Sequence, residues 1–385
     1  MTTDTHDSDH DQVRRGAQWT ATEIAQQPRL WREVARAAGE PTRAFLAPVL
    51  ARPGLRIVLT GAGTSAFAGQ VLAPGLGRRL GARVDAVATT DLVTTPRDCF
   101  AQDVPTLLVS FARSGDSPES VASTELADQC LSEVHHLLVT CNPDGRLARR
   151  HGDDARSHLL LMPAAADDQG FAMTSSFTCM TLAALLALDP SPQPALATRL
   201  AATAEGLLDA WGERAEQVSR RGYQRIVYLG SGALKGLARE SALKVLELTA
   251  GALVAIGDSP LAFRHGPKAI LDDRTLVVVY LSNDPYTRAY DLDLLAELRR
   301  TQGSEHVHAV TAEHGDLPAD DSTWTIPDAA DFDDAALAIP AVACAQQIAL
   351  HSSMSLGLHA DNPFPSGDVN RVVQGVRVHP LRAAR

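Results

Sequence analysis

The chain has 385 residues, of which 45% are hydrophobic and 21% charged, and 46 acidic residues against 35 Lys and Arg give a net charge of −11. This length supports two domains with complete cores, and the acidic balance argues against a nucleic-acid-binding protein, which needs a basic surface. No stretch reaches about 18 uninterrupted apolar residues, so we expect no membrane span.

The N-terminal residues are charged and of low complexity, and we expect a disordered tail over residues 1–18. The acidic, polar start lacks the basic and then apolar pattern of a secretory signal. The five cysteines are scattered and form no CxxC pair. Reduced thiols of this kind are typical of the cytoplasm, which is the expected location.

Two loops in the first half of the chain follow strand-like runs. The run 56–60 leads into "GAGTS", and an apolar run over 105–109 leads into "SFARSGDSPES" at 110–120. The second loop is either a turn with a helix N-cap or an anion site, because a helix N-terminus offers free N–H donors and a partial positive charge. The first loop lacks the third glycine of a dinucleotide fingerprint and carries hydroxyls, which suits one phosphate rather than two.

Four segments of the first half recur in the same order in the second half. Their offsets are nearly constant, at 169, 170, 169 and 171 positions. The paired segments begin at Arg56 and Arg225, Gly81 and Gly251, Thr106 and Thr275, and His135 and His306. This regularity indicates a tandem duplication.

Each repeat alternates Val-, Ile- and Leu-rich runs with helical stretches, the pattern of a parallel sheet covered on both faces. We therefore predict an α/β fold of two doubly wound, flavodoxin-like domains with parallel sheets flanked by helices. The expected first domain, with its helical lead-in, is 19–194, and the second, with a C-terminal tail, is 195–385. Prolines between 189 and 194 mark the link. Ligands of such sheets bind at the carboxyl ends of the strands. This favours the interpretation of residues 110–120 as an anion site over a simple turn with a helix N-cap.

The second repeat contains candidate acid–base groups. Glu240, Lys244 and Glu247 share one face of a helix, which is either a solvated salt-bridge face or part of a site. His265 stands at a loop-to-helix junction, and Asp258 ends a strand. Histidine pairs at 135–136 and 306–308 suggest a metal only weakly, and we expect none.

The motifs "GAGTS", "RSGDS", "ESALKVLEL" and "RHGP", in this order, resemble the sugar isomerase (SIS) domain. The isomerase half of glucosamine-6-phosphate synthase has the same two-copy layout, and the resemblance covers about residues 22–378. The segments "LELTAG", "DSPLAFRHGPKAIL" and "NPFPSGDVNRVVQGV" resemble the AgaS branch, the galactosamine-6-phosphate deaminase/isomerases also labelled tagatose-6-phosphate ketose/aldose isomerases. The resemblance implies two tandem SIS domains.

Matching positions imply a phosphate site in the first repeat. The implied phosphate-binding residues are Gly63, Thr64, Ser65, Ser114 and Ser117. The family loop often reads Ser-Gln-Ser-Gly-Glu-Thr, whereas this chain has Ala-Arg-Ser-Gly-Asp-Ser, so a serine is lost and Arg113 is gained. We expect Arg113 to pair with the phosphate, the alternative being that it points to solvent.

The resemblance also implies that Glu247 is the catalytic base, with Glu240 as a spare, and that His265 opens the sugar ring. In the related synthase the matching histidine enters the neighbouring subunit's site, which implies a homodimer or higher homo-oligomer with a shared active site. The weaker sugar-side candidates are Thr174, Ser175, Asp258, Lys268, Asn370 and Arg371. Gln374 stands where the family has a lysine, so no lysine role is carried over.

Conversion of an amino-aldose phosphate to a ketose phosphate needs ring opening, transfer of a proton from C2 to C1, and hydrolysis of the imine. A carboxylate and an imidazole suffice for the proton transfers, and no cofactor is expected. We predict conversion of galactosamine 6-phosphate to tagatose 6-phosphate and ammonia. The alternatives are another 6-phosphosugar such as glucosamine 6-phosphate, isomerisation without ammonia loss, and a non-catalytic sugar-phosphate sensor. The short N-terminus leaves no expected room for a glutaminase or helix-turn-helix domain.

Overall fold

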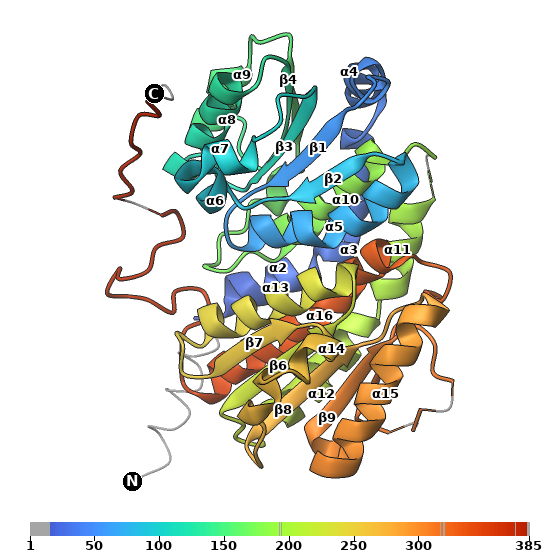
Figure 1. Ribbon diagram of the computed structural model, residues 1–385. Helices are drawn as coiled ribbons and strands as arrows, with labels where there is room; N and C mark the ends of the chain where they lie inside the picture. The colour runs from blue at the N-terminus through green and yellow to red at the C-terminus, as the bar shows by residue number, and fades with distance from the viewer. Residues whose placement is uncertain are drawn as a thin grey trace. The chain divides into compact units, whose positions relative to one another are not determined.

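The computed structural model describes residues 16–191, 193, 195–315, 317–318, 320–373 and 375–382 (Figure 1). Most of the predicted tail, and Gln374, lie outside the described residues. Contacts between Cα atoms divide the chain into two units. The β1–β5 unit comprises Arg32–Asp167, Ser176–Pro194 and Val369–Arg385, and the β6–β10 unit comprises Met1–Trp31, Asp168–Ser175 and Ala195–Asp368. The predicted domain ranges 19–194 and 195–385 stay a prediction.

The first unit is built on a five-stranded sheet in the order β2-β1-β3-β4-β5. Its strands are β1 (Arg56–Thr60), β2 (Arg83–Ala86), β3 (Thr106–Ala112), β4 (Val134–Thr140) and β5 (Ser157–Leu161). All four strand pairings are parallel. Every residue of β1 and β3 is buried, as expected for continuous apolar strands in a parallel sheet covered on both faces.

The second unit repeats this topology in the order β10-β9-β8-β6-β7. Its strands are β6 (Arg225–Gly230), β7 (Val254–Asp258), β8 (Thr275–Tyr280), β9 (Val307–Thr311) and β10 (Thr323–Thr325). Numbered within each unit, both sheets have the order 2-1-3-4-5, which is that of flavodoxin-like folds. The predicted fold class is therefore confirmed, and the two sheets share one strand order.

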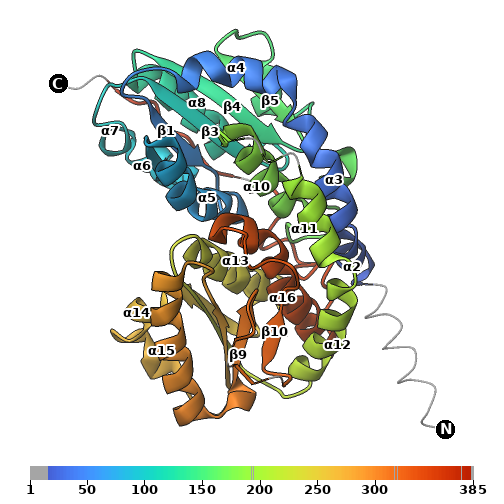
Figure 2. The ribbon, with the colours of Figure 1, turned by 90° about the vertical axis from the view of Figure 1, so that its right-hand side faces the viewer.

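Helices connect the strands and cover the sheets (Figures 1 and 2). Those in the first half of the chain are α2 (Gln18–Ala25), α3 (Gln27–Ala37), α4 (Glu40–Leu50), α5 (Thr64–Leu80), α6 (Thr89–Thr94), α7 (Pro96–Cys99), α8 (Pro118–Cys130), α9 (Arg146–His151) and α10 (Ser175–Leu188). Those in the second half are α11 (Leu196–Ala204), α12 (Leu207–Ser219), α13 (Ala233–Leu248), α14 (Pro260–Phe263), α15 (Pro285–Gln302) and α16 (Asp334–Ser355). Short 3₁₀ turns lie at Ala164–Ala166, Pro267–Ile270 and Ser304–His306.

The second sheet lies between two helical layers. In Figure 2, β9 and β10 lie between α15 on one side and α12 with α16 on the other. Helix α16 is mostly buried and packs against α12 and α13. Its mean hydropathy of 1.3 over an 18-residue window passes the length and composition test for a membrane span, but 89% of that window is buried within the protein. This burial is that of a core helix.

Candidate active site

The loop after β1 turns sharply because two glycines allow it. Gly63 has φ 55° and ψ −127°, a region that favours glycine, and a Cβ at Gly61 would lie 2.6 Å from Ser65. Helix α5 starts directly at Thr64, and the Thr64 and Ser65 side chains are 3% and 5% exposed. Two hydroxyl residues therefore begin a helix at the carboxyl end of β1.

The loop after β3 carries the predicted serines. Ser114 Oγ accepts the Asp116 N–H at 3.2 Å. Ser117 caps α8, since its Oγ accepts the Ser120 N–H at 3.3 Å and lies 2.7 Å from Ser120 Oγ. The N-cap interpretation of this stretch is therefore correct for Ser117. It does not exclude an anion, because a hydroxyl that accepts one bond can still donate another.

The two loops lie at neighbouring strand ends. Strand β1 pairs with β3 on one side and with β2 on the other, so the strand order reverses at β1. In open α/β sheets this switch point is where ligands bind, outside the carboxyl ends of the strands. The glycine loop and the serine loop flank it.

Arg113 is the cation of this region, and it is 6% exposed. Its Nη2 donates to the Arg371 carbonyl at 3.2 Å. Its Nη1 is buried and has no hydrogen-bond partner among the described residues. Because Arg113 is buried, the alternative that it points to solvent is wrong. A buried cation with no ion-pair partner, as found here among the described residues, is costly. The next residue along the chain is Ser114, which makes this guanidinium a fitting partner for an anion.

The β6–β10 unit holds the predicted base. On α13, the Lys244 ammonium lies 2.5 Å from Glu247 Oε2 and 3.4 Å from Glu240 Oε1. Lys244 and Glu240 are fully buried, whereas the Glu247 side chain is 24% exposed. The alternative of a solvated salt-bridge face is therefore wrong. Burial opposes the charge of Lys244, but the two carboxylates outweigh it and raise the pKa of Lys244. Glu247 is the member of this trio that solvent or a substrate can reach.

His265 lies in the exposed turn after α14 and precedes Gly266, which has φ 123°. The cations on either side of it are held by one carboxylate on α15. Glu297 accepts from Arg264 Nη2 at 2.8 Å and from the Lys268 ammonium. The turn therefore presents an exposed imidazole between two fixed cations.

Asp258, at the carboxyl end of β7, is already paired. Lys235 Nζ lies 2.9 Å from its Oδ1, and the Ser259 N–H donates to it at 2.8 Å. Burial opposes ionisation, but these bonds and the nearby cations outweigh burial and lower the pKa of Asp258. It is an ionised carboxylate near neutral pH.

The predicted sugar-side residues Thr174 and Ser175 are fully buried at the start of α10. Asp168 accepts both backbone N–H groups, at 2.8 and 2.9 Å, and the Thr174 hydroxyl at 3.0 Å. Ser175 Oγ donates to the Glu23 carbonyl at 2.6 Å. These hydroxyls therefore hold the helix start and the lead-in helix α2 together.

Two buried carboxylates, Glu23 and Asp168, were not predicted from the sequence. Glu23 is 3% exposed and accepts the N–H groups of Gln169 and, at 3.1 Å, Gly170. Burial first, and then the charge of Asp168, raise the pKa of Glu23 to about 7. The available signal was the helical lead-in expected at the start of the first domain, which contains Glu23 but does not reveal its partner 146 positions away.

The remaining predicted residues, Asn370 and Arg371, lie in the exposed segment that follows α16. The Arg371 carbonyl binds Arg113, and both residues belong to the β1–β5 unit. Among the described residues, no group of three or more His, Cys, Asp or Glu side chains could hold a metal ion.

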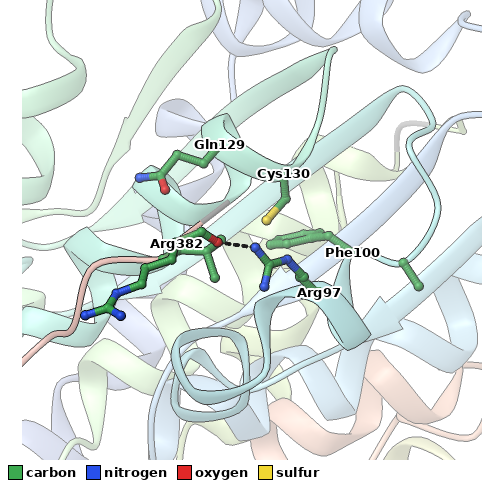
Figure 3. Close-up of a pocket in the computed structure, with 7 residues that line it drawn as sticks. Arg97, Phe100, Gln129, Cys130 and Arg382 are labelled. Atoms are coloured by element: carbon green, nitrogen blue, oxygen red, sulfur yellow. Dashed lines mark hydrogen bonds between the residues drawn. The ribbon is translucent and has the colours of Figure 1, made fainter. Parts of the chain in front are cut away.

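A cavity of about 590 Å³ lies elsewhere in the β1–β5 unit (Figure 3). It is lined by Arg97, Phe100, Ala101, Gln129, Cys130, Leu381 and Arg382. Figure 3 shows Arg97 directed at the Arg382 carbonyl, to which it donates. Arg56, the first residue of β1, donates to the Cys99 carbonyl at 2.7 Å, so the cavity lies toward the amino ends of the strands. The hydroxyl-bearing loops lie at the carboxyl ends of the strands, so the cavity is at the opposite end of the sheet from them.

Comparison with known proteins identifies the family. A model of the SIS domain matches residues 50–188. A Streptomyces coelicolor protein, provisionally named D-galactosamine-6-phosphate deaminase AgaS, is 63% identical over 367 residues, covering 94% of this chain and 95% of that protein. An Escherichia coli D-galactosamine-6-phosphate deaminase AgaS is 48% identical over 370 residues, covering 95% of this chain and 96% of that protein. The crystal structure of tagatose-6-phosphate ketose/aldose isomerase from Escherichia coli has a TM-score of 0.87 at 45% identity, covering 95% of this chain and 97% of that one.

The SIS match spans β1 to β5 and includes the hydroxyl-bearing loops after β1 and β3. The fold and these loops therefore place the chain among the SIS-domain proteins. Within this class, the two AgaS proteins are 63% and 48% identical to this chain over nearly its whole length, which identifies the branch. The chain belongs to the AgaS family of SIS-domain enzymes that act on sugar phosphates.

Proposed function

We propose that the protein converts galactosamine 6-phosphate and water to tagatose 6-phosphate and ammonia. The observation that carries the proposal is the buried Arg113 guanidinium, whose Nη1 has no partner among the described residues, beside a serine loop at the switch point of the first sheet. That arrangement suits one phosphate group. The choice of an amino sugar comes from the D-galactosamine-6-phosphate deaminases that the chain matches over 94–95% of its length.

In this proposal the phosphate binds between the loops after β1 and β3. Ser65, Ser114 and Ser117 donate hydroxyl hydrogen bonds, and Arg113 supplies the counter-charge. The backbone at Gly63 and Thr64 adds N–H donors at the start of α5. Binding of the phosphate fixes one end of the sugar and so lowers the entropic cost of orienting the rest of it.

The proposed chemistry starts with ring opening, in which His265 moves a proton between the C1 hydroxyl and the ring oxygen. The Glu247 carboxylate takes the C2 proton of the open-chain amino aldehyde while water protonates the C1 oxygen, giving an enaminol. Return of the C2 proton from Glu247 to C1, with loss of one N–H proton to the hydroxide left by that water, gives the C2 ketimine. Water adds to the ketimine carbon, and collapse of the adduct expels ammonia and leaves the ketone. Each proton taken is returned, so the overall change is hydrolysis of the C–N bond.

His265 also motivates a proposal on assembly. Its exposed position on a turn suits a group that enters a neighbouring copy's site, and we propose a homodimer or higher homo-oligomer with a shared active site. We further propose a cytoplasmic location, because all five cysteines are free thiols. The domain boundary at 194/195 is part of the same proposal.

A second candidate is ketose–aldose isomerisation without loss of ammonia. The observation that favours it is the 45% identity to the Escherichia coli tagatose-6-phosphate ketose/aldose isomerase structure. The same base and the same phosphate site serve both reactions, since both begin with proton transfer from C2 to C1.

Purified protein should be offered galactosamine 6-phosphate, glucosamine 6-phosphate and galactose 6-phosphate, with ammonia and ketose phosphate measured separately. Equimolar ammonia and tagatose 6-phosphate from the first sugar support the proposal. Tagatose 6-phosphate from galactose 6-phosphate, with no ammonia from either amino sugar, would favour the second candidate. Glu247→Gln serves as the inactive control that keeps the side-chain size.

A further inference from the structure

The second sheet repeats the glycine loop of the first. Gly232 has φ 55° and ψ −122°, matching Gly63 with φ 55° and ψ −127°. The side chains on this common backbone differ. Leu234, fully buried, stands 169 positions after Ser65, so the hydroxyl of the first copy is replaced by an apolar side chain.

Donors of the second copy are taken up by a carboxylate of the protein itself. Ser231 Oγ, in the loop after β6, donates to Asp291 Oδ1 at 2.6 Å, and the Ser282 N–H, after β8, donates to Asp291 Oδ2 at 3.0 Å. Strands β6 and β8 are neighbours, as β1 and β3 are in the first sheet. One fully buried carboxylate thus bridges the two loops at the second switch point.

A second carboxylate completes the arrangement. Asp334, at the start of α16, accepts the Ser282 hydroxyl at 2.6 Å and the Asn283 N–H at 2.9 Å. The Asn283 amide in turn donates to the carbonyls of Ala329 and Phe332 at 2.8 and 2.9 Å. The two loops therefore direct two N–H groups and two hydroxyls at carboxylate oxygens, the donor types that a phosphate takes.

The two copies differ in the charged groups beside the same loop. In the first copy a buried guanidinium, Arg113, precedes the serine loop. In the second copy the same offset of 169 places Ser282 at that position. Its N–H and hydroxyl donate to Asp291 and Asp334, and its carbonyl accepts from Arg288 Nη1 at 3.3 Å. The N–H and hydroxyl donors of the second copy are thus bound by carboxylates of the protein, and the Arg288 cation beside them donates to a backbone carbonyl.

We propose that Asp291, with Asp334, occupies the second copy's counterpart of the phosphate site, so that this site is closed from within and removal of the Asp291 carboxylate opens it to a small oxyanion. Burial first, and then the charge of Asp334, raise the pKa of Asp291 to about 6, against the hydrogen bonds from Ser231 and Ser282. In neutral to alkaline buffer the occupant is an ionised carboxylate, and a formate ion is its detached equivalent.

The test is chemical rescue of Asp291→Ala. The substitution is made in the Arg113→Met, Ser65→Ala, Ser114→Ala background, so that the first copy's loops contribute little to anion binding. Thermal unfolding is followed in formate, in inorganic phosphate and in chloride at equal ionic strength. We expect the Tm to fall in chloride and to rise with formate or phosphate along a saturating curve, while the parent shows no such curve.

The matched control is Asp320→Ala. Asp320 also accepts one N–H and one hydroxyl, both from Ser322 at 2.9 and 2.6 Å, but it lies in an exposed turn. Its loss should not be rescued by formate beyond the effect of chloride. This comparison separates occupation of a defined site from general salt stabilisation.

A saturating response confined to the Asp291 variant supports the proposal. Equal responses of both variants, or no response to either anion, would overturn it. If Asp291→Ala does not fold in chloride, the recovery of native near-ultraviolet circular dichroism on refolding, with and without formate, becomes the readout, and equal recovery counts against the proposal. None of these results depends on catalysis, so the proposed enzymatic function stands or falls separately.

Discussion

Replacing Arg113 by Met separates a phosphate-binding role from a structural one. Met keeps most of the length of the side chain and removes the guanidinium. Nη1 has no partner among the described residues, and Nη2 has the Arg371 carbonyl at 3.2 Å. Exchange of a poorly compensated buried charge for an apolar side chain is often neutral or stabilising. We therefore expect the Tm of Arg113→Met to equal or exceed that of the wild type.

The expected loss lies in substrate binding. A hydrogen bond to a charged group contributes about 1.5–3 kcal/mol, and each 1.4 kcal/mol is about tenfold in affinity. Loss of the guanidinium should therefore raise KM for a 6-phosphorylated amino sugar by about 10- to 150-fold. An amino sugar without the phosphate should show no comparable change, because the missing contact is to that group.

Steady-state ammonia release and thermal unfolding together check this prediction. Arg299→Met is the matched control, because Arg299 donates to the carbonyls of Val307 and Ser322 at 3.2 and 3.1 Å and so has partners to lose. It should lower the Tm and leave KM unchanged. If Arg113→Met lowers the Tm and leaves KM unchanged, Arg113 is a structural residue and the reasoning fails.

Further substitutions test the serine loop, the acid–base groups and Glu23. The double substitution Ser65→Ala, Ser114→Ala should raise KM and leave the fold intact. A wild-type KM would show that these serines only cap helices and do not bind the phosphate. Glu247→Gln should abolish exchange of the C2 proton with deuterated solvent while sugar-phosphate binding persists, so retained exchange would exclude it as the base. A mixture of Glu247→Gln and His265→Asn protomers should regain activity if two subunits share one active site. No recovery of activity, although the subunits demonstrably exchange, would contradict a shared site. The pKa of Glu23 in the folded protein is about 7, above its ordinary 4.5, so the protonated side chain stabilises the fold below pH 4.5 and this contribution is lost as pH rises through 7. Glu23→Gln should remove this pH-dependent part of the free energy of unfolding, about 3 kcal/mol. An unchanged pH profile in denaturant titrations would refute this prediction.

The fold could be predicted because its determinants are local and repeated. Continuous apolar runs such as residues 106–109 have the composition of strands buried on both faces. The offsets near 169 then align two copies of one topology, and the sheets do share the same strand order. Glycines such as Gly63, which need a positive φ, mark the tight turns at the strand ends.

The surroundings of the candidate site were harder to predict. Helical periodicity puts Glu240, Lys244 and Glu247 on one face but does not say whether that face meets water, and the structure buries Glu240 and Lys244 completely. Partners distant in sequence leave no local pattern. Asp291 and Ser231 lie 60 positions apart, and each is unremarkable in its own helix or loop.

The two units show that one backbone can carry different polar surroundings. Both have the same strand order and the same glycine turn. In the β1–β5 unit, Nη1 of the buried Arg113 guanidinium has no hydrogen-bond partner among the described residues, which favours an external anion. In the β6–β10 unit, Asp291 and Asp334 accept the N–H and hydroxyl donors of the equivalent loops, so a further anion would meet two carboxylates. In the function proposed above, this difference confines the phosphate to the loops after β1 and β3.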